Sequence, residues 1–264
     1  MKYFRRLWPL VFAALGVSLM FNAPVAHAAN PVPYPAALAG HPFAKQWTLQ
    51  EMSTAPWTTP GNDPGNCPAN PSAVSLVNNS YVQLNANGNP GNCTSIQSPH
   101  TYPTTPGYVY EAQIYVSNKA NWPAMWAYGD SWPSQGEIDA MEFNDEVNYV
   151  SWHYAPCNGQ TSSSEKSTNP WSYDCKTNLT PTSQPNFAPN SWVIVDYSFT
   201  STGVDVYYNG QLYVHVPESI SQNEAMWLTF SNGSCQGAGG NTCANPGDAS
   251  QAGNLGIKYF RAFT

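Results

Sequence analysis

The sequence predicts an all-β fold of two antiparallel sheets packed face to face. Short runs rich in Val, Ile, Tyr and Trp alternate with loops rich in Pro, Gly, Asn and Ser, which is typical of a β-sandwich. The chain shows no sustained helical periodicity, no heptad pattern and no clear internal repeat. Its 264 residues are enough for one large β domain with a sizeable core.

Alternating apolar residues place the strands along the chain. The clearest turn is Asn209-Gly210, because Asn-Gly between two alternating runs supplies the positive φ angles of a type I′ hairpin. The expected strands lie, in chain order, within Ala73–Asn85, Tyr108–Val116, the Trp-rich run Trp122–Tyr128, Glu137–Glu142, Tyr149–Tyr154, the hairpin Val204–Val216, Met226–Phe230 and Leu255–Phe263.

The first 28 residues are typical of an export signal. Lys2, Arg5 and Arg6 precede an apolar run from Leu7 to Met20, and Ala26-His27-Ala28 supplies a small-residue cleavage site. The apolar run is too short to span a bilayer comfortably. We therefore expect a signal peptide over residues 1–28, a single domain over residues 29–264, and a secreted, extracellular protein without a membrane anchor.

The charge balance excludes nucleic acid as a partner. Without the three basic residues of the signal, 6 basic residues face 16 acidic ones, a net charge of −10 that phosphates would repel. Charged residues make up 9% of the chain and aromatic residues 14%. This balance favours a sugar-binding surface, because the apolar faces of pyranose rings stack on Trp and Tyr.

Six cysteines follow the signal, an even number that suits an oxidising compartment and three disulfides. Fifteen pairings are formally possible. Pairing of neighbours would tie down three long loops, and each bridge would contribute roughly 2–4 kcal/mol. A zinc site is disfavoured, because no CxxC occurs and no histidine accompanies the cysteines. The neighbouring scheme joins Cys67 to Cys93, Cys157 to Cys175, and Cys235 to Cys243.

Three carboxylates share one short apolar stretch, Glu137-Ile-Asp139-Ala-Met-Glu142. Side chains alternate faces along a strand, so Glu137 and Asp139 share a face while Glu142 would point away. A β-bulge at Ala140-Met141 would return Glu142 to the acidic face. The two glutamates would then be roughly 13 Å apart at Cα, and their side chains could close to about 5–6 Å, the separation of a retaining glycosidase.

The surrounding charge supports a catalytic interpretation of this stretch. No Lys or Arg occurs from Ala120 to Glu165, so crowded carboxylates repel and at least one should keep its proton to higher pH. The alternatives are a solvated acidic face, a calcium site, or salt bridges to distant Arg or Lys. Solvated faces rarely place Ile, Ala and Met between their acids, and the nearby tryptophans suit sugar better than ions.

The run from Asn121 to Phe143 resembles the signature region of glycoside hydrolase family 16, in the bulged form of laminarinase-type β-glucanases. Similarity extends to Gly107–Glu111, Trp192–Tyr213 and Tyr259–Arg261. The resemblance implies a concanavalin-like β-jelly roll with the substrate on a curved sheet. It also implies roles for the three acids: Glu137 as nucleophile, Asp139 as its electrostatic helper and Glu142 as acid/base.

Other residues are candidates for binding the sugar. Trp132 resembles the family's stacking tryptophan, Trp122 is a weaker candidate, and His153 could hydrogen-bond the acids from the next strand. Gln113 and Phe199 depart from the family pattern of Arg and Trp, which puts the subsite preference in question more than the catalysis.

We therefore expect a monomeric, secreted, endo-acting retaining hydrolase that cleaves β-1,3 or mixed β-1,3/1,4 glucans. The alternatives are a galactan hydrolase or transglycosylase of the same family, and a lectin on the same fold. A lectin would not need both glutamates. The chemistry requires no cofactor and no metal, and a structural calcium ion away from the acids stays open.

Overall fold

The computed structural model describes residues 38, 40–59, 70–86, 93–117, 121–131, 135–144, 147–154, 175–179, 190–216, 225–233 and 253–264. All of them lie in one compact unit, Tyr34–Thr264. The predicted signal peptide and its cleavage site lie outside the described residues. Among the residues described, no helix is both long and apolar enough to cross a membrane.

The described residues form two antiparallel sheets with almost no helix, which confirms the predicted fold class. The larger sheet has eight strands, with β1 (Phe43–Trp47) paired to β15 at one side. Its other strands run in the order β13 (Gln211–Val216), β12 (Gly203–Tyr208), β11 (Trp192–Thr200), β6 (Val109–Val116), β15 (Gly253–Phe263), β3 (Tyr81–Ala86) and β2 (Val74–Val77).

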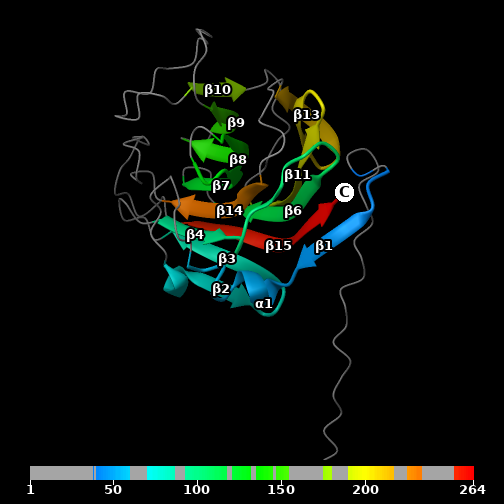
Figure 1. Ribbon diagram of the computed structural model, residues 1–264. Helices are drawn as coiled ribbons and strands as arrows, with labels where there is room; N and C mark the ends of the chain where they lie inside the picture. Colours follow the sequence, from blue (N-terminus) through cyan, green and yellow to red (C-terminus); the bar gives the residue numbers. More distant parts are fainter. Residues whose placement is uncertain are drawn as a thin grey trace, which may run out of the picture. The chain divides into compact units, whose positions relative to one another are not determined.

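The smaller sheet has seven strands and carries the acidic stretch on one of its middle strands (Figure 1). Its short strand β5 (Tyr102–Pro103) pairs with β14 off the main path. The main path runs β10 (Cys175–Leu179), β9 (Val147–Tyr154), β8 (Glu137–Asn144), β7 (Trp122–Tyr128), β14 (Ala225–Gly233) and β4 (Cys93–Gln97).

Within the described ranges, helical structure is limited to two short segments, α1 (Leu49–Met52) and a 3₁₀ turn at Pro71–Ala73. Helix α1 begins at Thr48, whose hydroxyl accepts from the Glu51 backbone N–H while the Glu51 carboxylate accepts from the Thr48 N–H. This capping box satisfies two backbone donors of a helix that is only one turn long. Buried Met52 then joins the core.

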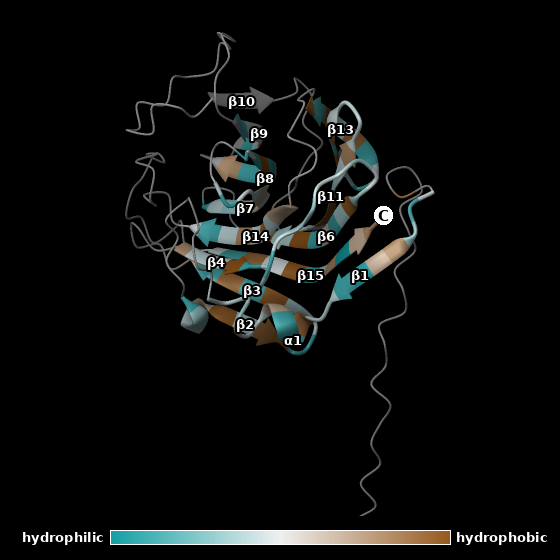
Figure 2. Ribbon diagram, in the orientation of Figure 1, coloured by the Kyte–Doolittle hydropathy of each residue, from teal (hydrophilic) through white to brown (hydrophobic). Residues whose placement is uncertain are grey.

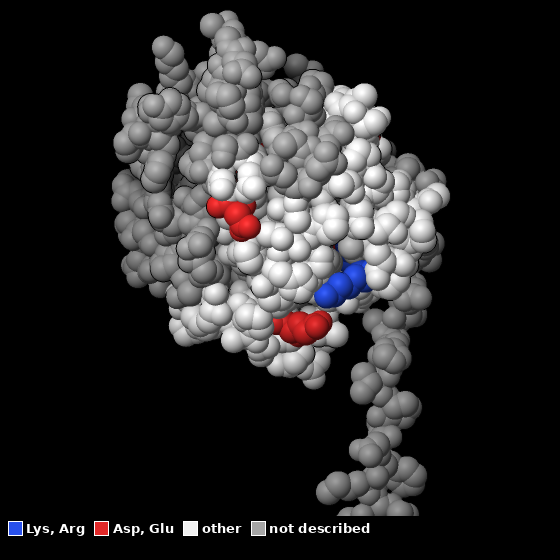
Figure 3. All heavy atoms as spheres, in the orientation of Figure 1, with Lys and Arg blue, Asp and Glu red and all other residues white. Residues whose placement is uncertain are grey.

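The core lies between the sheets and follows the period of two that the sequence shows. In β6, Tyr110, Ala112, Ile114 and Val116 are buried in the main apolar cluster, as predicted. Figure 2 shows hydrophobic and hydrophilic residues alternating in bands along the strands. On the face drawn in Figure 3, most of the described surface carries no charge, in keeping with the low charged fraction of the sequence.

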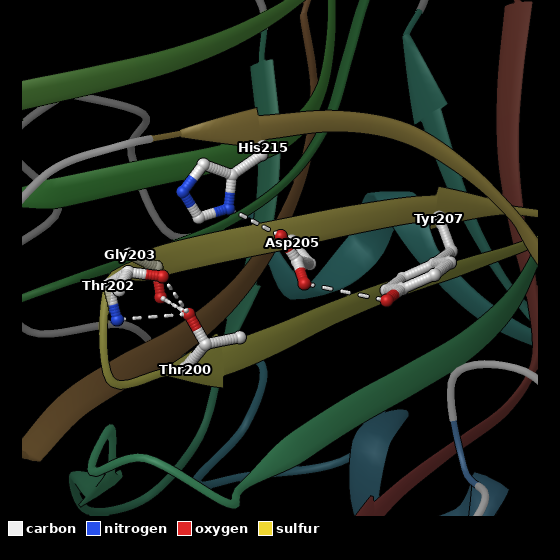
Figure 4. Close-up of polar contacts among 6 residues, drawn as sticks. All are labelled: Thr200, Thr202, Gly203, Asp205, Tyr207 and His215. Atoms are coloured by element: carbon white, nitrogen blue, oxygen red, sulfur yellow. Dashed lines mark hydrogen bonds and ion pairs between the residues drawn. The ribbon is translucent and has the colours of Figure 1, made fainter.

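The predicted hairpin is present. Asn209 and Gly210 have φ angles of 49° and 76°, as a type I′ turn requires. Across the β12–β13 pair, Asp205 lies opposite His215, and its Oδ1 is 2.6 Å from the imidazole Nδ1 (Figure 4). Tyr207 also donates to the same carboxylate at 3.5 Å. The turn before it in the chain, between β11 and β12, is closed by Thr200, whose hydroxyl donates to the Gly203 carbonyl.

A row of charged residues crosses the face of the larger sheet that is turned away from the core. Asp196 of β11 lies opposite Glu111 of β6, which lies opposite Arg261 of β15. The Arg261 Nε donates to Glu111 Oε1 at 2.6 Å, and both carboxylates are fully buried. Both oxygens of Asp196 lack a hydrogen-bond donor in the described structure. Burial therefore raises the pKa of Asp196 well above its usual range, and the neighbouring Glu111 adds to the rise.

This pKa predicts a pH-dependent stability. Asp196 keeps its proton in the fold but loses it near pH 4 when unfolded, so the free energy of unfolding falls as pH rises above that value, by up to about 1.4 kcal/mol per pH unit. Asp196→Asn stays neutral at every pH. We expect the variant to become progressively more stable than the wild type as pH rises from 4, measured by urea unfolding. A stability difference that does not change with pH would contradict the prediction.

Candidate active site

Strand β8 contains the predicted bulge. On the β7 side, Met141 lies opposite Met125 and Asp139 lies opposite Trp126, so Ala140 has no partner on β7. On the β9 side the register also shifts between Asp139 and Glu142. One residue is therefore inserted in β8 relative to both neighbouring strands, at the position that the spacing of the acids indicates.

The bulge brings the three acids to one face. Their partners on β7 are Tyr128 for Glu137, Trp126 for Asp139 and Ala124 for Glu142. These partners form a small cluster with Trp227, separate from the main core. The side chains between the acids belong instead to the main core, namely Ile138, Ala140 and Met141, with Met125 and Ala127 on β7. The acids thus lie on the face of the smaller sheet that is turned away from the core.

His153 lies beside two of the acids, as predicted. It is opposite Glu137 on β9, and its Nε2 lies 3.5 Å from Glu137 Oε1 and 3.3 Å from Asp139 Oδ2. The exposed fractions are small: 9% for Glu137, 3% for Asp139 and 8% for His153. The imidazole therefore lies between two carboxylates that are themselves almost fully buried.

Trp122 contacts the third acid. Its indole N–H donates to Glu142 Oε1 at 2.7 Å, from the start of β7 to the end of the acidic stretch. Glu142 is 8% exposed. The sequence predicts Trp122 as a sugar-binding residue, and the structure places it within hydrogen-bond distance of Glu142. A donor to one carboxylate oxygen fixes the orientation of the group.

Gly136 allows the chain to enter β8 immediately before Glu137. Its φ angle is +82°, a conformation that residues with a side chain rarely adopt. The ring of Trp152, the β9 partner of Ile138, fills the space beside it: a Cβ at Gly136 would lie 2.4 Å from Trp152 Cη2. The position of Glu137 thus depends on the absence of a side chain at the preceding residue.

A cluster of aromatic side chains adjoins the acids. The rings of Trp126 and Tyr128 stack at 5.0 Å, and Trp227 packs against them from β14. Hydrogen bonds fix the three side chains: Trp126 to Ser231, Tyr128 to Gln97 and Trp227 to Asp130. Trp126 is 6% exposed, and the sequence did not single out Trp227 as a residue of the site. The alternation of Trp227, Thr229 and Ser231 with apolar residues was the signal available.

Several predicted residues cannot be placed. Trp132 lies outside the described residues, as do Cys67, Cys157, Cys235 and Cys243, and Cys175 has no described side chain. Cys93 is disulfide-bonded. Its partner is not among the described side chains, so the three pairings stay predictions.

Glu137, Asp139 and His153 could also hold a metal ion, since one ligand atom of each lies within 4.8 Å of the others. Two carboxylates and an imidazole are a donor set that divalent cations accept. The contacts of His153 with both acids account for the same geometry without an ion.

Comparison with known protein families identifies the chain. The model of the XgeA-like catalytic domain of glycoside hydrolase family 16 matches residues 70–210, more than half of the chain, including all three acids and His153. The chain belongs to glycoside hydrolase family 16. A search of curated protein sequences finds no match.

Solved structures share the family 16 fold. LamAcat from Zobellia galactanivorans is 15% identical with a TM-score of 0.59, over 84% of this chain and 98% of that one. The laminarinase catalytic domain from Thermotoga petrophila is 16% identical with a TM-score of 0.58, over 85% and 98%. A mixed-linkage glucan enzyme of family 16 from Bacteroides ovatus is 15% identical with a TM-score of 0.51, over 72% and 84%.

Gly136→Ala should impair this family 16 site. The positive φ alone costs about 1–2 kcal/mol, and the new methyl group would collide with Trp152 and displace Glu137. We expect a lower melting temperature and a loss of most hydrolytic activity. Gly107→Ala is the matched control, because Gly107 has a φ of +102° and open space around the added atom. Equal activity in the two variants would show that the collision with Trp152 is unimportant.

Proposed function

We propose that the chain is a secreted, endo-acting, retaining hydrolase of β-glucans, in which Glu137 is the nucleophile, Glu142 the acid/base and Asp139 the helper of Glu137. The observation that carries the proposal is the register of β8, which turns Glu137, Asp139 and Glu142 to one face of a sheet. Two carboxyl groups on one surface are what glycoside hydrolysis requires, and in the retaining form they lie about 5–5.5 Å apart.

In the first step, a Glu137 carboxylate oxygen attacks the anomeric carbon while the bond to the leaving oxygen breaks. The proton of Glu142 passes to that oxygen. His153 Nε2 contacts both Glu137 and Asp139, so it holds the Glu137 carboxylate in place beside its helper as the covalent bond forms. In the second step, Glu142 takes a proton from water, the hydroxide attacks the anomeric carbon, and Glu137 leaves as the carboxylate.

The contact of Trp122 with Glu142 supports this assignment of acid/base. The acid/base must alternate between carboxyl and carboxylate during each cycle, and a fixed donor to Oε1 keeps the group oriented in both forms. Trp227 provides a partly exposed ring on the same face, packed on buried Trp126 and Tyr128, and we propose that Trp227 and Trp132 contact the glucan.

A β-glucan is the substrate that the structural relatives favour. One structure of LamA from Zobellia galactanivorans contains laminaritriose and laminaritetraose, and the Bacteroides ovatus enzyme contains a mixed-linkage product. A screen of released oligosaccharides over laminarin, mixed-linkage glucan, xyloglucan and agarose tests this proposal. Release from agarose alone would favour the galactan hydrolase, and longer products on added acceptor would favour the transglycosylase.

We also propose export and disulfide bonding. Residues 1–28 have the charge, the apolar run and the small-residue site of a signal peptide. The mature protein should therefore begin at Ala29, which N-terminal sequencing of the secreted protein would establish. Peptide mapping without reduction should find Cys67 joined to Cys93, Cys157 to Cys175 and Cys235 to Cys243.

Glu137→Gln should keep the fold and substrate binding but lose nearly all turnover. The amide has a similar shape, yet it cannot form the covalent bond to the sugar. We expect activity on laminarin to fall by at least about a thousandfold, with an unchanged melting temperature. Retention of more than about one-tenth of the activity would exclude Glu137 as the nucleophile.

The stereochemistry of the first product tests the mechanism independently of any variant. If Glu137 attacks directly, the anomeric configuration is inverted twice and therefore kept. Proton NMR of a fresh laminarin digest should show the β-anomer first, with the α-anomer growing only as fast as mutarotation allows. An α-anomer at the earliest time would mean that water attacks in a single step.

A further inference from the structure

The bulge in β8 leaves buried Ala140 outside the register of the sheet. Ala140 has no partner on β7, and the register with β9 also shifts at this point. Ala140 is fully buried, so bulk water cannot form a hydrogen bond with its carbonyl oxygen. A buried carbonyl without a donor would weaken the bulge, because the same chain could then pair in regular register.

The opposite sheet supplies a donor for the Ala140 carbonyl. The hydroxyl of Tyr208, at the end of β12, donates to the Ala140 carbonyl oxygen at 2.8 Å. The same hydroxyl accepts from the side-chain amide of Asn148 on β9 at 2.7 Å. An amide, a phenol and a carbonyl thus form one buried chain of hydrogen bonds across the core, in which each bond strengthens the next.

Packing holds the Tyr208 ring in the position from which its hydroxyl donates to the Ala140 carbonyl. It is 2% exposed, and its ring stacks on Tyr213 with ring centres 4.4 Å apart. Burial raises the pKa of its hydroxyl far above the neutral range, so the group remains a donor at any pH where the enzyme folds. The donor is therefore present and correctly placed whether or not substrate is bound.

We propose that Tyr208 is a positioning residue for Glu142: by bonding the Ala140 carbonyl from the opposite sheet, it holds the bulge that turns Glu142 to the face of Glu137. The inference rests on the proposed roles of the two glutamates. Glu137 and Asp139 precede the bulge and are paired with Tyr128 and Trp126 in regular register. Glu142 follows the bulge, so relaxation of the inserted residue moves Glu142 and leaves Glu137 in place.

This difference gives Tyr208→Phe a distinctive kinetic signature. Loss of the hydroxyl should impair proton donation by Glu142 more than attack by Glu137. Natural β-glucans need a proton on the leaving oxygen, whereas aryl β-glycosides with a good leaving group need little protonation. We expect kcat on laminarin to fall by about tenfold or more with little change in KM, and the first step on the aryl substrate to fall much less.

Three variants complete the experiment. Tyr110→Phe is the matched control, because it also removes a buried tyrosine hydroxyl that donates to a backbone carbonyl, that of Pro103, which is not on β8; it should show no difference between the two substrates. Glu142→Ala sets the limit for complete loss of the acid, with azide expected to restore turnover of the aryl substrate. Asn148→Ala leaves the Tyr208 hydroxyl in place but removes its donor, so its effect should be intermediate. It also serves if Tyr208→Phe fails to fold.

Each outcome of these measurements either supports or overturns the positioning role of Tyr208. Equal loss on both substrates, or no loss, in folded Tyr208→Phe would overturn the proposal, as would the same substrate-dependent loss in Tyr110→Phe. A crystal structure of Tyr208→Phe supplies a readout without activity: we expect Glu142 to be displaced while Glu137 and His153 remain in contact. An unmoved Glu142 would refute the positioning role. A wild type without activity on any glucan would contradict the proposed function but leave this structural test intact.

Discussion

A β-strand presents alternate side chains to opposite faces, and β8 brings three carboxylates to one face only because Ala140 is inserted. Everything around the site depends on this extra residue. The apolar side chains between the acids enter the core, the acids meet Trp122 and His153 outside it, and two neighbouring strands accept the shifted register. A strand without the insertion would bury Glu142 among apolar residues, where a carboxylate is strongly disfavoured.

Both sheets contribute to the geometry of the site. The smaller sheet supplies every acid and the residues that contact them, whereas the larger sheet contributes through the core. Strand β12 belongs to the larger sheet and β8 to the smaller one, yet the Tyr208 hydroxyl reaches the Ala140 carbonyl. Rigidity at the site therefore comes partly from packing on the far side of the catalytic strand, and substitutions there can change turnover without touching the sugar.

The local features of the molecule could be predicted from the sequence, and the long-range ones could not. The odd spacing of Glu137, Asp139 and Glu142 predicts the bulge, and Asn209-Gly210 predicts the hairpin turn, because each depends on a few adjacent residues. Strands β1, β4, β5 and β10 were not predicted, since their residues lack a clear apolar alternation, and β11 was indicated only by the resemblance of Trp192–Tyr213 to the family. Trp227 and Tyr208 reach the site only through strand pairings and packing between distant parts of the chain, which no local pattern encodes.

The position of β15 determines when the larger sheet can form during synthesis. This strand, Gly253–Phe263, lies between β6 and β3 and also pairs with β1, although it follows all of them in the chain. A growing polypeptide therefore cannot close the larger sheet until residues far along the chain have been synthesised, and pairing over such separations is slow. For a chain that is exported as proposed, this delay would be useful: the segment emerging from the ribosome stays open, and so remains competent to be threaded through a narrow translocation channel before it folds.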